Sequence, residues 1–218
     1  MSCTTALSSL SDWTCRTLVA RKARQYSGIL NTPAHFVELL FWVEDKRFAV
    51  HFGVDPISVA RAIVSNVHRG SRLQGASTIP QQVCTIRLSR FCRVCRSFPY
   101  KLKQVSASLY LSAAKSRASI LDEYVNTVYW GRSYHGLDKA AQGYFNGTRK
   151  SLSIVQSFFL AERLAAPNRL SVPRISNLFK RTPIQLALLR NGATLADIID
   201  LYERIYSCGG EMWRLLGK

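Results

Sequence analysis

Apolar residues recur with helical spacing along most of the chain. The pattern is clear in five segments: Ile57–Val67, Leu102–Ala113, Ile120–Tyr129, Ile154–Ala165 and Thr194–Tyr206. Their spacing of three and four residues is typical of helices that bury one face. A long strict alternation of apolar and polar residues, which would indicate strands, is hard to find. We therefore predict a mainly α-helical fold.

Helix-breaking residues separate these segments. Glycine and proline gather at 70–75, Pro99, 131–136, Gly147 and 167–173. Pro99 precedes a helical pattern that begins at Tyr100, and a proline costs little in the first turn of a helix because its missing N–H would have no partner there. The predicted organisation has three parts: a loosely ordered tail over residues 1–30, one domain over 31–190 and a helical extension over 191–218.

No apolar run is long enough to span a membrane. The longest runs, Phe36–Val43 and Phe158–Ala166, fall well short of the roughly 18 residues that a span needs. Charged residues also interrupt them, Glu38 in the first run and Glu162 with Arg163 in the second. The first thirty residues lack the basic start and apolar core of a signal peptide. We predict neither a transmembrane helix nor a signal peptide in this chain.

The composition adds a strong positive charge to this picture. Of 218 residues, 47% are hydrophobic, which is enough for a buried core, and the formal net charge is +17. Such a surface favours an anionic partner, and nucleic acid, anionic lipid and pyrophosphate all fit; a basic surface that only aids solubility is the alternative. One CxxC pair, Cys92 with Cys95, has no second pair or histidine pair to complete a zinc site, so no metal centre is expected.

Residues 44–55 concentrate charged side chains directly after an apolar run. Glu44 and Asp45 are adjacent acids, His51 follows, and Asp55 closes the stretch. A carboxylate beside apolar surface is suited to act as a general base, because poor hydration favours its neutral form. The structural alternative is that Asp45 and Asp55 cap helices and His51 makes a local hydrogen bond. Glu44 is the strongest candidate for chemistry.

A second stretch, residues 74–82, combines small residues with paired amides. Gly75 and Ser77 allow the backbone to approach a ligand closely, and Gln81 with Gln82 supplies hydrogen-bond donors and acceptors. Taken alone, such a loop is more often a turn and a helix cap. Its position after the acidic stretch favours a binding role.

Together the two stretches resemble the motifs of family 51 glycosyltransferases, the peptidoglycan glycosyltransferase domains of class A penicillin-binding proteins and monofunctional transglycosylases. The first family motif, EDxxFxxHxGxD, is complete here, and the second, GxSTxxQQ, is matched with Pro80 where Thr is usual. Residues 120–126 resemble the family's ILExYLN, and residues 152–173 resemble its closing segment. The resemblance covers about residues 33–190 in the family's order.

The resemblance implies a lysozyme-like helical domain with a long cleft, in which lipid II is joined into β-1,4-linked glycan strands and undecaprenyl diphosphate is released. Glu44 matches the family's catalytic base. The matched positions that imply substrate binding are Ser77, Gln81, Gln82, Arg96, Lys101, Lys103, Gln104 and Asn126. The matched positions that imply a structural role are Asp45, Phe48, His51, Gly53, Asp55, Gly75 and Thr78. No cofactor is implied as required, and assistance by a divalent cation such as Mg²⁺ stays open.

This chain departs from the family on the side of the donor sugar. The family's RKxxE motif falls on residues 100–104, so Tyr100 replaces an arginine and neutral Gln104 replaces a glutamate. Thr85 and Ile86 stand where the family has lysine and asparagine. Because preorganised charges stabilise a departing diphosphate, these losses predict a slower reaction.

Two interpretations follow from the departures. Either Arg87, Arg90 and Arg93 compensate and the enzyme is weak but real, or the domain binds lipid II or glycan without polymerising it. The intact first motif around Glu44 favours weak or specialised activity. The family places this chemistry at the outer face of the cell membrane, sometimes beside a transpeptidase partner, and no recognised nucleic-acid-binding motif supports the nucleic-acid alternative.

Overall fold

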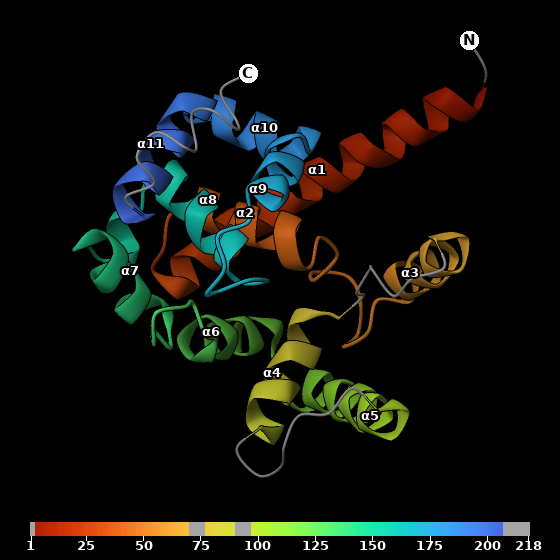
Figure 1. The fold of residues 1–218 in the computed structure, drawn as a ribbon. Coiled ribbons are helices and arrows are strands. Elements are labelled where there is room, and N and C mark those ends of the chain that lie inside the picture. The colour runs from red at the N-terminus through yellow and green to blue at the C-terminus, as the bar shows by residue number, and fades with distance from the viewer. Residues whose placement is uncertain (1–2, 70–76, 90–96, 207–218) are drawn as a thin grey trace. The chain divides into compact units, whose positions relative to one another are not determined.

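The computed structural model describes residues 3–69, 77–89 and 97–206 (Figure 1). These residues form helices and no β-sheet, so the prediction of a mainly α-helical fold is confirmed. The chain divides into two compact units. Unit 1 contains Met1–Val43 and Tyr129–Lys218, and unit 2 contains Glu44–Val128. The lysozyme-like cleft and the predicted domain boundaries stay predictions.

Unit 1 is built around two apolar helices. Its helices are α1 (Cys3–Leu30), α2 (Ala34–Glu44), α7 (Leu137–Phe145), η1 (Arg149–Ser151), α8 (Ile154–Arg163), α9 (Val172–Phe179), α10 (Thr182–Arg190) and α11 (Leu195–Tyr206). Most residues of α2 and α8 are buried, and the rings of Phe36 and Trp130 pack 6.2 Å apart in this core. Helix α2 ends at Glu44, the first residue of the first motif.

The N-terminal segment differs from the loose tail that was expected. Residues 3–30 form helix α1, coloured red in Figure 1. Its C-terminal half buries Val19, Ala23, Tyr26 and Leu30, which share one face because they lie three and four residues apart, and Tyr26 packs edge-on against Phe41 of α2. Among the described residues, no helix combines the length and the apolar character needed to cross a membrane.

Helix α8 carries an ion pair into the core of unit 1. Glu162 and Arg163 are both fully buried, and the guanidinium of Arg163 bonds the Glu162 carboxylate. Tyr202 of α11 donates to Glu162 at 2.9 Å, and Arg163 donates to the hydroxyl of Tyr206 at 2.7 Å. Buried charges need such partners, because each would otherwise be desolvated without compensation. The pair therefore fastens α11 to α8.

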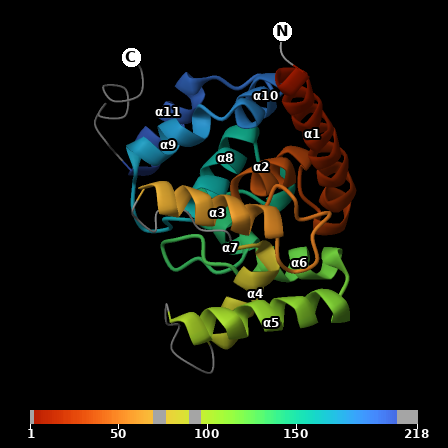
Figure 2. The same ribbon diagram turned by 90° about the vertical axis from the view of Figure 1, so that its right-hand side faces the viewer.

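In its described residues, unit 2 is a smaller group of four helices. These are α3 (Pro56–Arg69), α4 (Ile79–Leu88), α5 (Phe98–Ala114) and α6 (Arg117–Thr127). Helix α4 packs against both α5 and α6, and Figures 1 and 2 show α4 and α5 side by side. Ser97 caps α5 by accepting a hydrogen bond from the backbone N–H of Tyr100, and Pro99 lies in the first turn, as expected from the sequence.

Candidate active site

Glu44, the predicted general base, lies half-buried at the C-terminal end of α2. Its Oε2 accepts a hydrogen bond of 2.7 Å from the side-chain amide of Gln82, which comes from the second turn of α4. The two motifs that are 38 residues apart in the sequence are therefore joined by a direct side-chain contact. A neutral donor fixes the carboxylate without removing its negative charge, which is the state that a general base requires.

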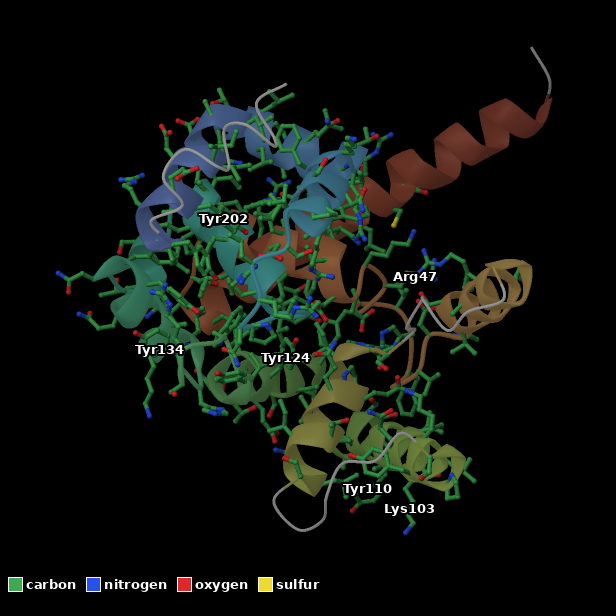
Figure 3. All side chains as sticks on the ribbon, in the orientation of Figure 1. Arg47, Lys103, Tyr110, Tyr124, Tyr134 and Tyr202 are labelled. Atoms are coloured by element: carbon green, nitrogen blue, oxygen red, sulfur yellow. The ribbon has the colours of Figure 1, made fainter. Side chains whose placement is uncertain are left out.

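Tyr124 of α6 extends this contact into a relay of three side chains. Its hydroxyl donates to Gln82 Oε1 at 2.7 Å, and Figure 3 labels the ring within unit 2. Burial, together with the negative charges of Glu44 and Asp45, raises the pKa of Tyr124 well above its usual range. The hydroxyl therefore stays protonated and holds the oxygen of the Gln82 amide, so the NH₂ group of that amide faces Glu44.

Asp45 ties the start of α4 to the loop that follows α2. Its Oδ2 accepts hydrogen bonds from the backbone N–H of Ile79 at 3.0 Å and from His51 Nε2 at 2.8 Å. His51 and Asp45 are both buried, and the His51 ring packs edge-on against buried Phe48. Asp45 thus acts as a brace that sets the position of α4, and with it Gln82, relative to Glu44.

The rest of the first motif shapes the turn into α3. Asp55 accepts from the backbone N–H groups of Ile57 and Ser58 at the first turn of α3, and from Arg47 Nε at 2.9 and 3.1 Å. Burial alone would raise the pKa of Asp55, but the hydrogen bonds from Arg47 and Ser58 outweigh it and lower the pKa. Arg117 of α6 supports the same loop by donating to the backbone oxygens of Phe48 and His51.

Gly53 and Thr78 join the two motifs through the backbone. Gly53 has φ +77°, and an added Cβ would lie 2.5 Å from the backbone oxygen of Ser108, so a side chain is excluded. Thr78 donates to Gly53 O at 2.6 Å and forms a capping box with Gln81. Gln81 is buried and its side-chain oxygen accepts from Thr78 N at 3.1 Å, so Gln81 caps α4 here.

A second polar group surrounds the ammonium of Lys101. Its Nζ lies 3.1 Å from Ser77 Oγ and 2.6 Å from Gln104 Oε1. Partial burial lowers the pKa of Lys101. Gln104 is buried, and its Nε2 donates to Thr85 Oγ1 at 2.5 Å and to Gln81 O at 3.2 Å. Four residues singled out in the sequence, Ser77, Thr85, Lys101 and Gln104, are thereby brought into one network.

Arg87, one of the three arginines that could compensate in the first interpretation, is paired with an acid. Its guanidinium forms two 2.5 Å hydrogen bonds with the Glu123 carboxylate of α6, and Lys115 also contacts that carboxylate. The hydrogen bond from Arg87 lowers the pKa of Glu123, so the pair stays charged and closed. The proposed compensators Arg90 and Arg93 lie outside the described residues, as do Gly75 and Arg96.

Two other predicted binding residues lie on exposed helix surfaces. Lys103, labelled in Figure 3, is exposed on α5. Asn126 is exposed on α6 and donates to Asp122 one turn earlier, at 3.0 Å.

The described residues hold no cluster of three His, Cys, Asp or Glu side chains suited to a metal ion. A cavity of about 730 Å³ between α7, α8 and α11 is lined by unit 1 residues and does not involve Glu44.

Comparison with known proteins gives one family. Residues 12–189 match the family described as Transglycosylase. The chain is 35% identical over 156 residues to penicillin-binding protein 1A of Rickettsia prowazekii (strain Madrid E), covering 70% of this chain and 19% of that protein. It is 32% identical over 181 residues to penicillin-binding protein 1A of Neisseria flavescens, covering 83% of this chain and 22% of that protein.

This chain therefore belongs to the transglycosylase family, glycosyltransferase family 51, and is related to the transglycosylase region of penicillin-binding protein 1A. It spans about a fifth of the length of these relatives. The sequence did not reveal that Tyr124 belongs to the site. In the sequence Tyr124 stands out only because it lies in a segment that resembles the family. Its hydrogen bond to Gln82 depends on the packing of α6 against α4, which the sequence does not show.

Proposed function

We propose that this chain polymerises lipid II into β-1,4-linked glycan strands and releases undecaprenyl diphosphate, with Glu44 as the general base. The observation that carries the proposal is the relay from Tyr124 through Gln82 to Glu44. The relay holds one carboxylate oxygen in place through a neutral donor. In the proposed reaction, Glu44 takes the proton of the acceptor sugar's 4-hydroxyl as that oxygen attacks the donor sugar, and the diphosphate leaves with the bonding electrons.

The proposed reaction also needs cations for the leaving group and a surface for its lipid. Lys101 beside Ser77 supplies a positive charge in unit 2, where the resemblance places the donor side.

Apolar side chains of the same unit are open to solvent: Phe52, Ile57 and Val64 are each more than half exposed. This exposure favours contact with a membrane surface.

The experiment is polymerisation of fluorescently labelled lipid II by the purified full-length chain, with and without detergent or membrane. Glu44→Gln keeps the size of the side chain and removes its basicity, so we expect the rate to fall by roughly 10²- to 10⁴-fold. Asp200→Asn, on an exposed face of α11, is the matched control and should leave the rate unchanged. Polymer formed equally well by Glu44→Gln would exclude this role for Glu44.

A second candidate function is binding of lipid II or glycan without turnover. It is favoured by the neutral pair Thr85 and Gln104, which stands where the family carries a lysine and a glutamate. The same experiment separates the two functions. Retention of labelled lipid II without polymer, unaltered by Glu44→Gln, would support the binding module, whereas polymer that depends on Glu44 supports the enzyme.

A further inference from the structure

The hydrogen bonds around Gln104 require a neutral donor at this position. Its Nε2 points at Gln81 O, which can only accept, and at Thr85 Oγ1. Thr85 already donates its hydroxyl hydrogen to Gln81 O at 3.0 Å, so it meets Gln104 as an acceptor. A carboxylate here would present an oxygen to two acceptors in a buried place, which is unfavourable. With both amide hydrogens in use, Gln104 Oε1 is left to face Lys101.

The ammonium of Lys101 consequently has neutral partners. Among the described residues its hydrogen-bond acceptors are Ser77 Oγ and Gln104 Oε1, and none of its partners is a carboxylate. An ammonium has three hydrogens, so one remains for a ligand oxygen. Lys101 as a residue is exposed, but its ammonium between Ser77 and Gln104 is partly desolvated without an acid beside it, which lowers the pKa of Lys101. A bound anion would remove this penalty.

We propose that Gln104 is a positioning residue that holds the Lys101 ammonium beside Ser77 without neutralising it, so that this group retains a phosphate oxygen of the departing diphosphate more tightly than an acid at position 104 would permit. The inference rests on the proposed function for the identity of the anion. It gives the neutral residue at position 104 a role of its own, because a glutamate would pair with Lys101 and cancel its charge.

The test is binding of inorganic pyrophosphate to the full chain, measured by titration calorimetry at neutral pH. Gln104→Glu should weaken binding roughly tenfold, because it adds a negative charge within a few ångströms of the anion in a partly buried place. Gln104→Met removes the hydrogen bond and keeps the site neutral, so binding should weaken by no more than about threefold. Lys180→Met, at the end of α9, is the control for general attraction to a basic protein and should leave binding unchanged.

The pH dependence of pyrophosphate binding is a second measurement, which would not change if Gln104 had only a structural role. Binding through Lys101 is lost as the pH rises through its pKa, which burial lowers in the natural chain and a carboxylate at position 104 would raise. The alkaline loss should therefore occur at higher pH in Gln104→Glu. The other ionisable side chains of the helices packed on α5 are those of α4 and α6: Cys84, Arg87, Arg117, Asp122, Glu123 and Tyr124. All of them are common to the two proteins compared.

Pyrophosphate bound equally well by Gln104→Glu, or a loss in Gln104→Met as large as in Gln104→Glu, would overturn the inference. An alkaline loss that does not move between the natural chain and Gln104→Glu would overturn it as well. Thermal unfolding of each variant shows whether the fold is intact. The proposed function is tested separately, by the dependence of lipid II polymerisation on Glu44. Pyrophosphate binding does not report on Glu44, so either proposal can fail without the other.

Discussion

The Tyr124 hydroxyl offers a direct test of the relay that orients Glu44. Tyr124→Phe removes one hydrogen bond, from the hydroxyl to Gln82 Oε1 at 2.7 Å, and keeps the buried ring. A neutral hydrogen bond of this kind contributes about 1 kcal/mol, and about 1.4 kcal/mol corresponds to a tenfold change in rate. If the lost energy appears in the transition state, polymerisation should slow about fivefold, far less than for Glu44→Gln.

The assay is the initial rate of polymerisation of labelled lipid II, combined with thermal unfolding of the variant. The melting temperature should fall by roughly 2–4 °C for the loss of about 1 kcal/mol in a protein of this size. Tyr129→Phe is a suitable control, because that hydroxyl donates to exposed Asn168 of unit 1. An unchanged rate would show that the relay does not orient Glu44. A fall as large as that of Glu44→Gln would show that Tyr124 does more than orient Gln82.

Two further predictions concern stability and are measured by urea unfolding. Gly53→Ala should lower the free energy of unfolding by about 2 kcal/mol or more, because its positive φ and the closeness of Ser108 O both exclude a methyl group. Gly28→Ala, in an open part of α1, should instead raise the free energy of unfolding by roughly 0.5–1 kcal/mol. Arg163→Met should cost about 3 kcal/mol, because the buried Glu162 carboxylate loses its closer cation and keeps only Arg174 at 3.5 Å; a milder loss for Arg163→Met combined with Glu162→Gln would confirm that the uncompensated charge is the cause.

Much of the helical content could be predicted from local pattern. The segment Ile57–Val67 lies within α3, and Pro99 lies in the first turn of α5, because amphipathic spacing and the tolerance of proline in a first turn are properties of neighbouring residues. Helix α1 was missed, although Val19, Ala23, Tyr26 and Leu30 share one helical face. Its first half carries mostly small and polar residues, which masked the stripe that α1 buries.

The sequence by itself determined the family and the candidate base, because the first motif sets Glu44 among residues at fixed spacing. The tertiary structure decided which side chains act together. Gln82 bonds Glu44 from 38 residues further along the chain, and Tyr124 bonds Gln82 from 42 residues beyond that. Arg87 pairs with Glu123 of α6. Hydrogen bonds and ion pairs depend on distances of a few ångströms between separate helices, and local sequence pattern carries no information about those distances.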